Sequence, residues 1–202
     1  DGSKMSKSKG NVVDPREVVK EYGLDQFRYF MLREVPFGQD GDFSKKALID
    51  RINSDLSNDL GNLINRVIGM SEKYFNFNIN SFDVLKFHQK ELDVIHTILE
   101  NAQKLVFKMQ INKYIEEIWK VLKIANKTIS DYEPWIKIKN GKQDEAMALV
   151  ALIYNILVKV SILIDPIIPK STKNLSICLN IVINIYLYIK LIKNKKLISK
   201  VT

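Results

Sequence analysis

The amino-acid sequence predicts a mainly α-helical protein, with a helical bundle over residues 44–175 preceded by a small α/β linking unit over residues 1–43. Two observations carry this prediction. Apolar residues recur every three or four positions over most of the chain, which is the spacing of a helix that buries one face. Short loops join these segments, as they do in helical bundles. The 202 residues are 46% hydrophobic, which suffices for a real core and excludes a disordered chain.

The first unit contains two predicted helices. Asp14-Pro15-Arg16-Glu17 is a strong helix start, because aspartate caps free amides, proline suits the first helical position and a carboxylate follows three residues after the cap. This helix should end near Gly23. The second should run from Asp25 to about Glu34, where Pro36 and the stretch FGQDGDFS break the pattern.

Three amphipathic helices open the predicted bundle. Ser44 caps the first, whose apolar spacing continues to about Tyr74. The second is marked by apolar positions from Leu92 to Met109, and the third runs from Tyr114 to near Asp131. Trp119 lies on the apolar stripe of the third helix, so we expect it in the core.

Residues 147–164 are apolar on nearly every side and long enough to raise the alternative of a membrane span. Asn155 and Lys159 fall in the middle, where they would be costly in lipid. We therefore expect the central helix of a bundle, ended by Asp165-Pro166, and no membrane partner.

The last segment, residues 176–202, differs from the rest. From Ile177 to Leu191 every odd position is a branched apolar residue, a period of two that predicts a strand or an unfolded segment. Its bias toward Ile, Asn, Lys and Tyr is also typical of a low-complexity extension. We assign it no function.

Charge and cysteine content limit the possible partners and sites. The net charge of +8 favours a polyanion such as nucleic acid or an anionic membrane surface. The lone Cys178 excludes an internal disulfide and a cysteine zinc site, and a reducing compartment is the default. His88 and His96 are about 12 Å apart along a helix, so we read both as ordinary helix residues and expect no metal site. Since the chain begins with Asp and shows no signal-peptide pattern, we expect it to be cut from something longer.

The stretch DGSKMSKSKGN at the start has three lysines and three serines between two glycines. Glycine at each end and the lack of an apolar face predict a mobile surface loop. Ammonium and hydroxyl groups together suit a polyphosphate better than a planar carboxylate. From composition alone, an expression-tag remnant or a solvated basic tail is the commoner explanation.

KMSKS followed by KGNVVDP resembles the signature loop of class I aminoacyl-tRNA synthetases. FRYFMLREVPFGQDGDFS, SNDLGNLINR and YEPW then resemble the methionyl-tRNA synthetase family more than the cysteinyl, leucyl, isoleucyl or valyl enzymes. The similarity runs from residue 1 to about residue 175. It implies that the complete protein joins methionine to tRNA(Met) using ATP and Mg²⁺, and that residues 44–175 form the anticodon-binding domain.

The resemblance implies roles for the residues of the loop. Lys7 would steady the departing pyrophosphate, with Lys4 in support, and Met5, Ser6 and Ser8 would complete the ATP-binding loop. Physical chemistry agrees with the role of Lys7, because a cation placed beforehand against the charge that develops on the leaving group lowers the barrier.

The resemblance also implies an anticodon site made of Asn62, Arg66 and Trp135. Asn62 and Arg66 are four residues apart and share a helix face, and their side chains suit hydrogen bonds to base edges. Glu133 precedes a proline and should be extended, so Pro134 should end the preceding helix and present the Trp135 indole beyond it, where a base can stack. Without the family, the polar pair is more often a solvated face, and the tryptophan more often packs under a loop.

Two alternatives remain at this point. A stand-alone RNA-binding helical module has no need of a pyrophosphate clamp, and another class I synthetase would lack the set Asn62, Arg66 and Trp135. Neither His88 nor His96 is followed by the glycine of the family's ATP-cradling motif. We therefore expect residues 1–202 alone to form no adenylate. The expected location is the cytoplasm or an organellar matrix.

Overall fold

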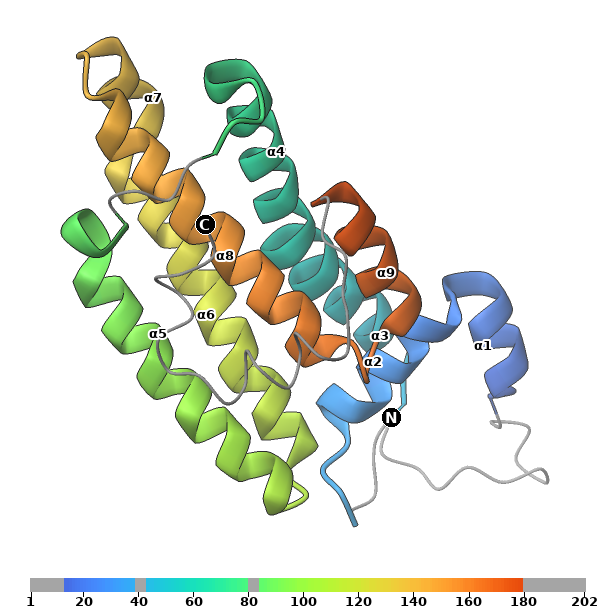
Figure 1. Cartoon of the computed structure of the whole chain (residues 1–202). Helices are drawn as coiled ribbons and strands as arrows, with labels where there is room; N and C mark the ends of the chain where they lie inside the picture. The colour runs from blue at the N-terminus through green and yellow to red at the C-terminus, as the bar shows by residue number, and fades with distance from the viewer. Residues whose placement is uncertain (1–12, 39–42, 80–83, 180–202) are drawn as a thin grey trace.

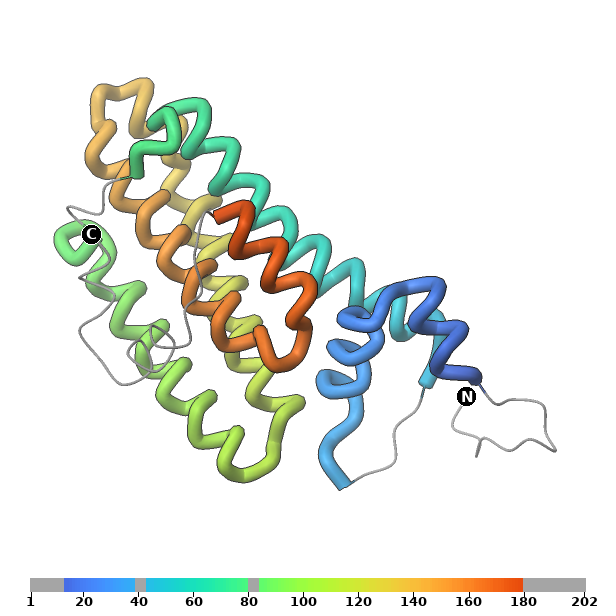
Figure 2. Tube along the Cα trace, turned by 45° about the vertical axis from the view of Figure 1, so that its right-hand side comes forward, coloured from blue at the N-terminus to red at the C-terminus, as the bar shows by residue number. Residues whose placement is uncertain are grey.

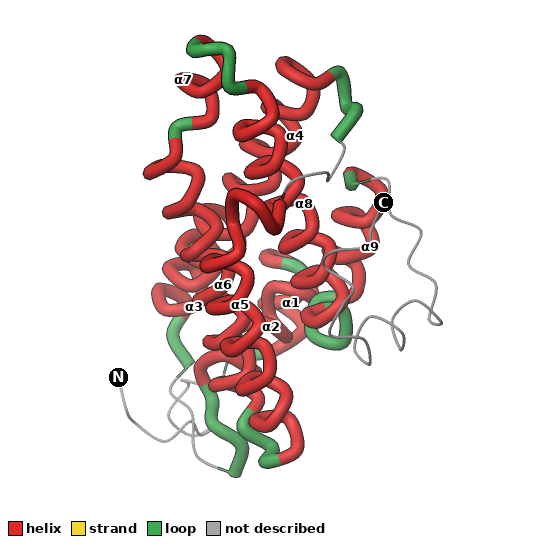
Figure 3. Tube along the Cα trace, turned by 60° about the vertical axis from the view of Figure 1, so that its left-hand side comes forward, coloured by secondary structure: helices red, strands yellow, loops and turns green. Residues whose placement is uncertain are grey.

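The computed structural model describes residues 13–38, 43–79 and 84–179, and within these ranges it contains helices and loops but no strand (Figures 1 and 3). The elements in chain order are α1 (Pro15–Tyr22), α2 (Leu24–Glu34), α3 (Lys45–Arg51), the π-helix η2 (Ile52–Gly61), α4 (Asn62–Phe75), α5 (Val84–Phe107), α6 (Ile111–Tyr132), α7 (Pro134–Lys139), α8 (Gln143–Ile164) and α9 (Pro169–Cys178). The predicted helical class is confirmed. The α/β character expected for the first unit has no counterpart in residues 13–38, which form α1 and α2.

α8 lies at the centre of the bundle and packs against α4, α5, α6, α7 and α9 (Figures 1 and 2). Within the described ranges it is the one helix long and apolar enough to cross a membrane, and 67% of its most apolar window is buried inside the protein. The expectation of a central bundle helix is therefore confirmed. The apolar surface that suggested a membrane span faces the neighbouring helices.

The first unit starts as the sequence predicts. The Asp14 carboxylate accepts a hydrogen bond from the Arg16 amide at 2.8 Å, and Pro15 is the first residue of α1. Gly23, with a φ of 98°, ends α1 and turns the chain into α2. A side chain there would require that backbone angle and would also meet the Gln26 amide oxygen at 2.5 Å.

The helix predicted over 44–74 is continuous, but its central part is not α-helical. The Ser44 hydroxyl accepts from the Ala47 amide at 3.0 Å and caps α3, as predicted. From Ile52 to Gly61, however, the backbone follows the wider π-helical hydrogen-bond pattern before returning to α at Asn62. Apolar spacing reports which side of a helix is buried, and it does not report this change of hydrogen-bond register.

Other differences between the predicted and the observed helices lie at helix ends. α5 begins at Val84, ahead of the apolar run that marked it, and is kinked at His88 with φ −133° and ψ 28°. His88 is therefore not an ordinary helix residue. The short helices α7 and α9 were not predicted, and α9 includes Ile177 and Cys178, where the period of two predicted an extended chain. The rest of that tail, residues 180–202, lies outside the described residues.

A buried carboxylate joins α2 to η2. Asp55, 5% exposed, accepts a hydrogen bond from the Tyr29 hydroxyl at 2.7 Å, and the guanidinium groups of Arg51 and Arg33 lie 3.4 and 3.9 Å from the same oxygen. The Tyr29 ring also packs on Trp119 of α6, with 4.8 Å between ring centroids. Trp119 is 3% exposed, as expected for a core residue. These contacts fix the first unit on the bundle.

Removing this carboxylate should strongly destabilise the fold. Asp55→Ala removes the acceptor of the buried Tyr29 hydroxyl and the carboxylate beside Arg33, while Arg51 keeps its ion pair with Glu34. We therefore expect the free energy of unfolding to fall by about 3 to 5 kcal/mol in urea denaturation. Asp59→Ala, one turn further on, is the matched control and should cost less than about 1 kcal/mol, because burial already raises the pKa of the Asp59 carboxyl. Equal losses in the two variants would contradict the role of Asp55.

His88 should make stability depend on pH. The side chain is 1% exposed, and burial lowers the pKa of His88 below its ordinary 6.5, with the Glu91 carboxylate opposing this in part. The unfolded chain therefore takes up the proton first as the pH falls. The free energy of unfolding should be constant well above pH 6.5 and fall below it, by at most about 1.4 kcal/mol per pH unit.

Urea titrations at pH 5 and pH 8 measure this dependence. His88→Phe should flatten the slope, and His96→Gln, which keeps His88, should retain it. A slope that survives in His88→Phe would show that another group is responsible.

Candidate nucleic-acid interface

Asn62 and Arg66 occupy one face at the start of α4, as their spacing predicts. The Asn62 side chain is exposed. Arg66 is half-buried and donates a hydrogen bond from Nη2 to the Ser130 hydroxyl of α6 at 3.3 Å. This contact brings α4 against the last turn of α6, five residues before Trp135.

Trp135 is the second residue of α7, directly after a sharp corner. α6 ends at Tyr132, and Glu133 is left-handed, with φ 47° and ψ 64°. The extended conformation expected for Glu133 is therefore wrong, and Pro134 opens a new helix as well as following the end of the old one. Pro134 is buried, and Trp135 is half-buried with one side against the main core. The indole is thus partly available to solvent, and it packs on a rigid base.

The face of α6 toward η2 carries candidates that sequence reasoning missed. The Asn126 amide donates to the Asp59 carbonyl at 2.8 Å, so this face lies against η2. Lys123 and Lys127 flank Asn126 and are exposed. Ammonium groups spaced four residues apart form a row that can contact successive phosphates. The signal was present in the sequence as an i, i+4 lysine pair ahead of Ser130, on the helix that leads to Trp135.

The loop residues Lys4, Met5, Ser6, Lys7 and Ser8 lie outside the described residues. The structure does show where the loop joins the fold. Val13, just before α1, packs with Phe43 against a small apolar cluster of Val18, Phe30 and Leu48. The chain therefore enters the described fold at the end of the molecule that α1 and α2 form (Figure 2).

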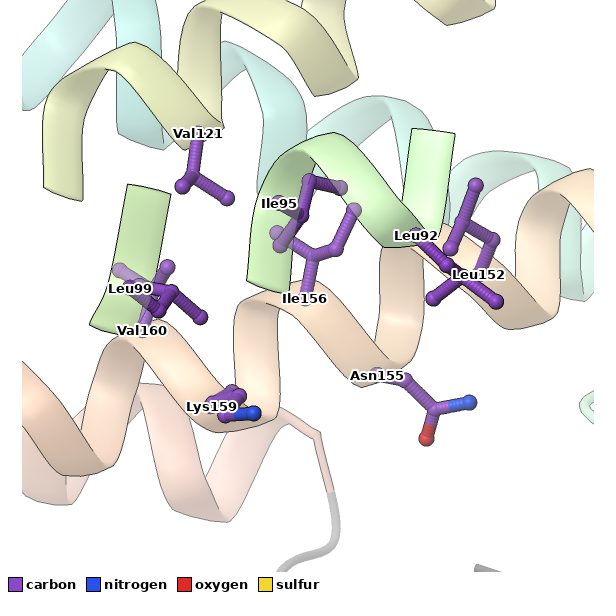
Figure 4. A pocket seen from close by; sticks show the side chains of 9 residues that line it. All are labelled: Leu92, Ile95, Leu99, Val121, Leu152, Asn155, Ile156, Lys159 and Val160. Carbon is purple, nitrogen blue, oxygen red and sulfur yellow. The ribbon is translucent and has the colours of Figure 1, made fainter. Parts of the chain in front are cut away.

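Two hollows elsewhere do not fit a nucleotide. One, of about 270 Å³, lies among α2, η2, α8 and α9, and no charged side chain lines it to meet a phosphate. The other lies between α5 and α8 beside Asn155 and Lys159 (Figure 4). Its volume of about 10 Å³ holds at most a water molecule. Burial there lowers the pKa of Lys159.

Metal ligands do not gather in this part of the protein. Within residues 13–38, 43–79 and 84–179, no three side chains of His, Cys, Asp or Glu lie together as a metal site requires. The candidate interface in these ranges consists of amide, guanidinium, ammonium and indole groups.

Two models of known protein families match the chain. Residues 1–68 match the model for class I tRNA synthetases (M), and residues 85–187 match the model for the anticodon binding domain of methionyl tRNA ligase. The second match runs past residue 175, where we expected similarity to end. That expectation was wrong.

Individual proteins agree with the family models. Methionine–tRNA ligase of Campylobacter jejuni is 52% identical over 199 residues, which is 98% of this chain and 32% of that protein. The Helicobacter pylori ligase is 49% identical over 197 residues, 98% of this chain and 30% of that protein. The chain thus spans about a third of the length of the curated relatives it matches.

A solved structure of a methionyl-tRNA synthetase has a similar fold. Mycobacterium tuberculosis methionyl-tRNA synthetase in complex with methionyl-adenylate superposes with a TM-score of 0.78 at 35% identity, covering 84% of this chain and 34% of that one. Since the anticodon-domain model alone matches about half of the residues and the class I model matches the part before it, this chain belongs to the methionyl-tRNA synthetase family.

Proposed function

We propose that this chain is the anticodon-reading and pyrophosphate-stabilising portion of a methionine–tRNA ligase, which attaches methionine to tRNA(Met) at the expense of ATP. The observation that carries the proposal is the bond from Arg66 to Ser130, because it joins the face of α4 to the turn that leads into Trp135. Two segments 64 residues apart in sequence thereby meet, and Trp135 follows Ser130 by five residues.

The anticodon site works by stacking and directional hydrogen bonds. The Trp135 indole receives the face of a base that has been splayed out of the loop, and the core behind it keeps the ring from yielding. Asn62 offers an amide donor and acceptor to a base edge, and Arg66 keeps guanidinium N–H groups beyond the one used by Ser130. Lys123 and Lys127 supply phosphate contacts that add affinity without selectivity.

The amino-terminal loop acts at a different step. In the complete enzyme the Mg²⁺–ATP substrate is attacked at its α-phosphate by the methionine carboxylate, and pyrophosphate leaves. Lys7 contacts the charge that moves onto the pyrophosphate, and Lys4 supports it. Ser6 and Ser8 orient phosphate oxygens, while Met5 anchors the loop on an apolar surface. The free, exposed Cys178 suits a reducing cytoplasm or organellar matrix.

Anticodon reading by Trp135 can be tested with RNA stem-loops. The chain should bind a CAU anticodon stem-loop more tightly than one with a changed anticodon, and Trp135→Ala should weaken CAU binding by roughly 5- to 150-fold, the equivalent of about 1 to 3 kcal/mol. Fluorescence anisotropy at two salt concentrations measures both affinities, and the preference should survive the higher salt.

Phe107→Ala is the matched aromatic control, since Phe107 is 83% exposed at the end of α5. It should leave both affinities unchanged. Equal binding of the two stem-loops that fades with salt would instead favour a stand-alone RNA-binding module.

The role of Lys7 can be tested in a chimera that joins the preceding part of the Campylobacter jejuni ligase to this chain. Lys7→Ala should slow ATP–pyrophosphate exchange by about 10²- to 10³-fold, because one preplaced electrostatic donor is lost, and it should leave CAU binding unchanged. Lys9→Ala, in the same loop, should stay within a few-fold of the parent. The isolated 202-residue chain should show no exchange, and activity in it would contradict the proposal.

A further inference from the structure

The corner between α6 and α7 holds an unfavourable backbone conformation. Glu133 has a positive φ of 47° without being glycine or asparagine. Such a conformation costs about 1 to 3 kcal/mol and persists only where the surrounding structure imposes it. The helix that follows has only six residues, too few to be stable alone, so its direction depends on its tertiary contacts.

Side chains from three other helices converge on Tyr132, the last residue of α6 before this corner. Its hydroxyl donates to Glu145 of α8 at 3.3 Å, and the Lys137 ammonium of α7 lies 4.7 Å from the centre of its ring. The His88 ring of α5 meets the same ring edge-to-face, with 5.1 Å between centroids. Tyr132 is thus held by a cation over its ring, by a second ring and by a hydrogen bond at its hydroxyl.

Glu145 closes the cluster by pairing with Lys137 and Lys142, each at 3.2 Å. The hydrogen bonds from these two lysines lower the pKa of the Glu145 carboxyl, so it is ionised at neutral pH. Lys137 is therefore held at two points, by the tyrosine ring and by the carboxylate. It lies two residues after Trp135 on the same short helix, so the contacts that hold Lys137 also hold α7.

We propose that Tyr132, Lys137 and Glu145 form a positioning cluster for anticodon recognition, which sets the orientation of α7 and hence the tilt of the Trp135 indole. The inference rests on the proposed function and adds residues that need not touch RNA. Stacking requires the indole and the base to be parallel. A helix free to rotate about Glu133 would present the indole in several orientations, only some of which stack.

Glu145→Gln is the decisive variant, because charge and positioning predict opposite results. Loss of a carboxylate near a polyanion should by itself strengthen RNA binding. Loss of the ion pair that holds Lys137 of α7 should instead weaken CAU binding by about tenfold and leave the changed anticodon unaffected or bound slightly tighter.

Glu117→Gln is the matched control. Glu117 of α6 is 22% exposed, as is Glu145, and likewise pairs with a lysine, Lys120, at 2.6 Å, but it lies well before the corner. It should keep CAU affinity within twofold of wild type. The proposal is overturned if Glu145→Gln binds CAU as tightly as wild type or more tightly, or if the two variants weaken it equally.

A second pair of variants separates the loss of positioning from a general loss of stability. Tyr132→Phe removes only the hydroxyl bond to Glu145, and Tyr114→Phe removes a comparable bond to the Leu163 carbonyl at the other end of α6. The two should lower thermal stability alike, but only Tyr132→Phe should reduce the preference for CAU. Reduced preference in both variants, or in neither, would overturn the inference.

Acrylamide quenching of tryptophan fluorescence gives a readout independent of RNA. Trp119 is 3% exposed, so the quenchable signal reports Trp135. Quenching should increase in Glu145→Gln and not in Glu117→Gln, and equal quenching in both would contradict the cluster's role. If Trp135→Ala has no effect on CAU binding, the proposed function fails and the inference with it. If Trp135→Ala weakens binding and Glu145→Gln does not, only the inference fails.

Discussion

The buried carboxylate of Asp55 is the contact on which the arrangement of the molecule depends. It is where Tyr29 of α2, the arginines Arg33 and Arg51, and the π-helix meet. A buried ion cluster adds little net stability compared with apolar packing, but it tolerates only one geometry. It therefore fixes how α2 is docked on the bundle.

On the proposed RNA surface, different side chains supply affinity and selectivity. Exposed lysines such as Lys123 and Lys127 project from the bundle into solvent, where their attraction for phosphate is long-ranged and weakened by salt. Trp135 and Arg66 are half-buried and attached to neighbouring helices, so they make short-range contacts that depend on shape. Discrimination between bases requires side chains that cannot adapt to the wrong base, and the packed helices behind this surface supply that rigidity.

Features set by local sequence were predicted, and features set by tertiary contacts were not. The Asp14 cap, the Ser44 cap and the burial of Trp119 follow from residue type and spacing, and all three are confirmed. The left-handed Glu133 contradicts the ordinary preference of a residue before proline, because contacts from α5, α7 and α8 on its neighbour outweigh that preference. The same spacing that placed Asn62 and Arg66 on one face could not reveal which side chains hold the indole.

The π-helix η2 changes which side of the helix the residues after it face. Residues seven apart share a side in an α-helix, so a purely α-helical run would point both side chains the same way. The wider turns of η2 advance each residue by a smaller angle. Asp55 accordingly faces the interior while Asn62 faces solvent. The π-helical stretch thus sets a fixed rotation between Asp55 and Asn62. Its length is therefore constrained, whereas the identity of its exposed residues, such as Asn53 and Asn58, is not.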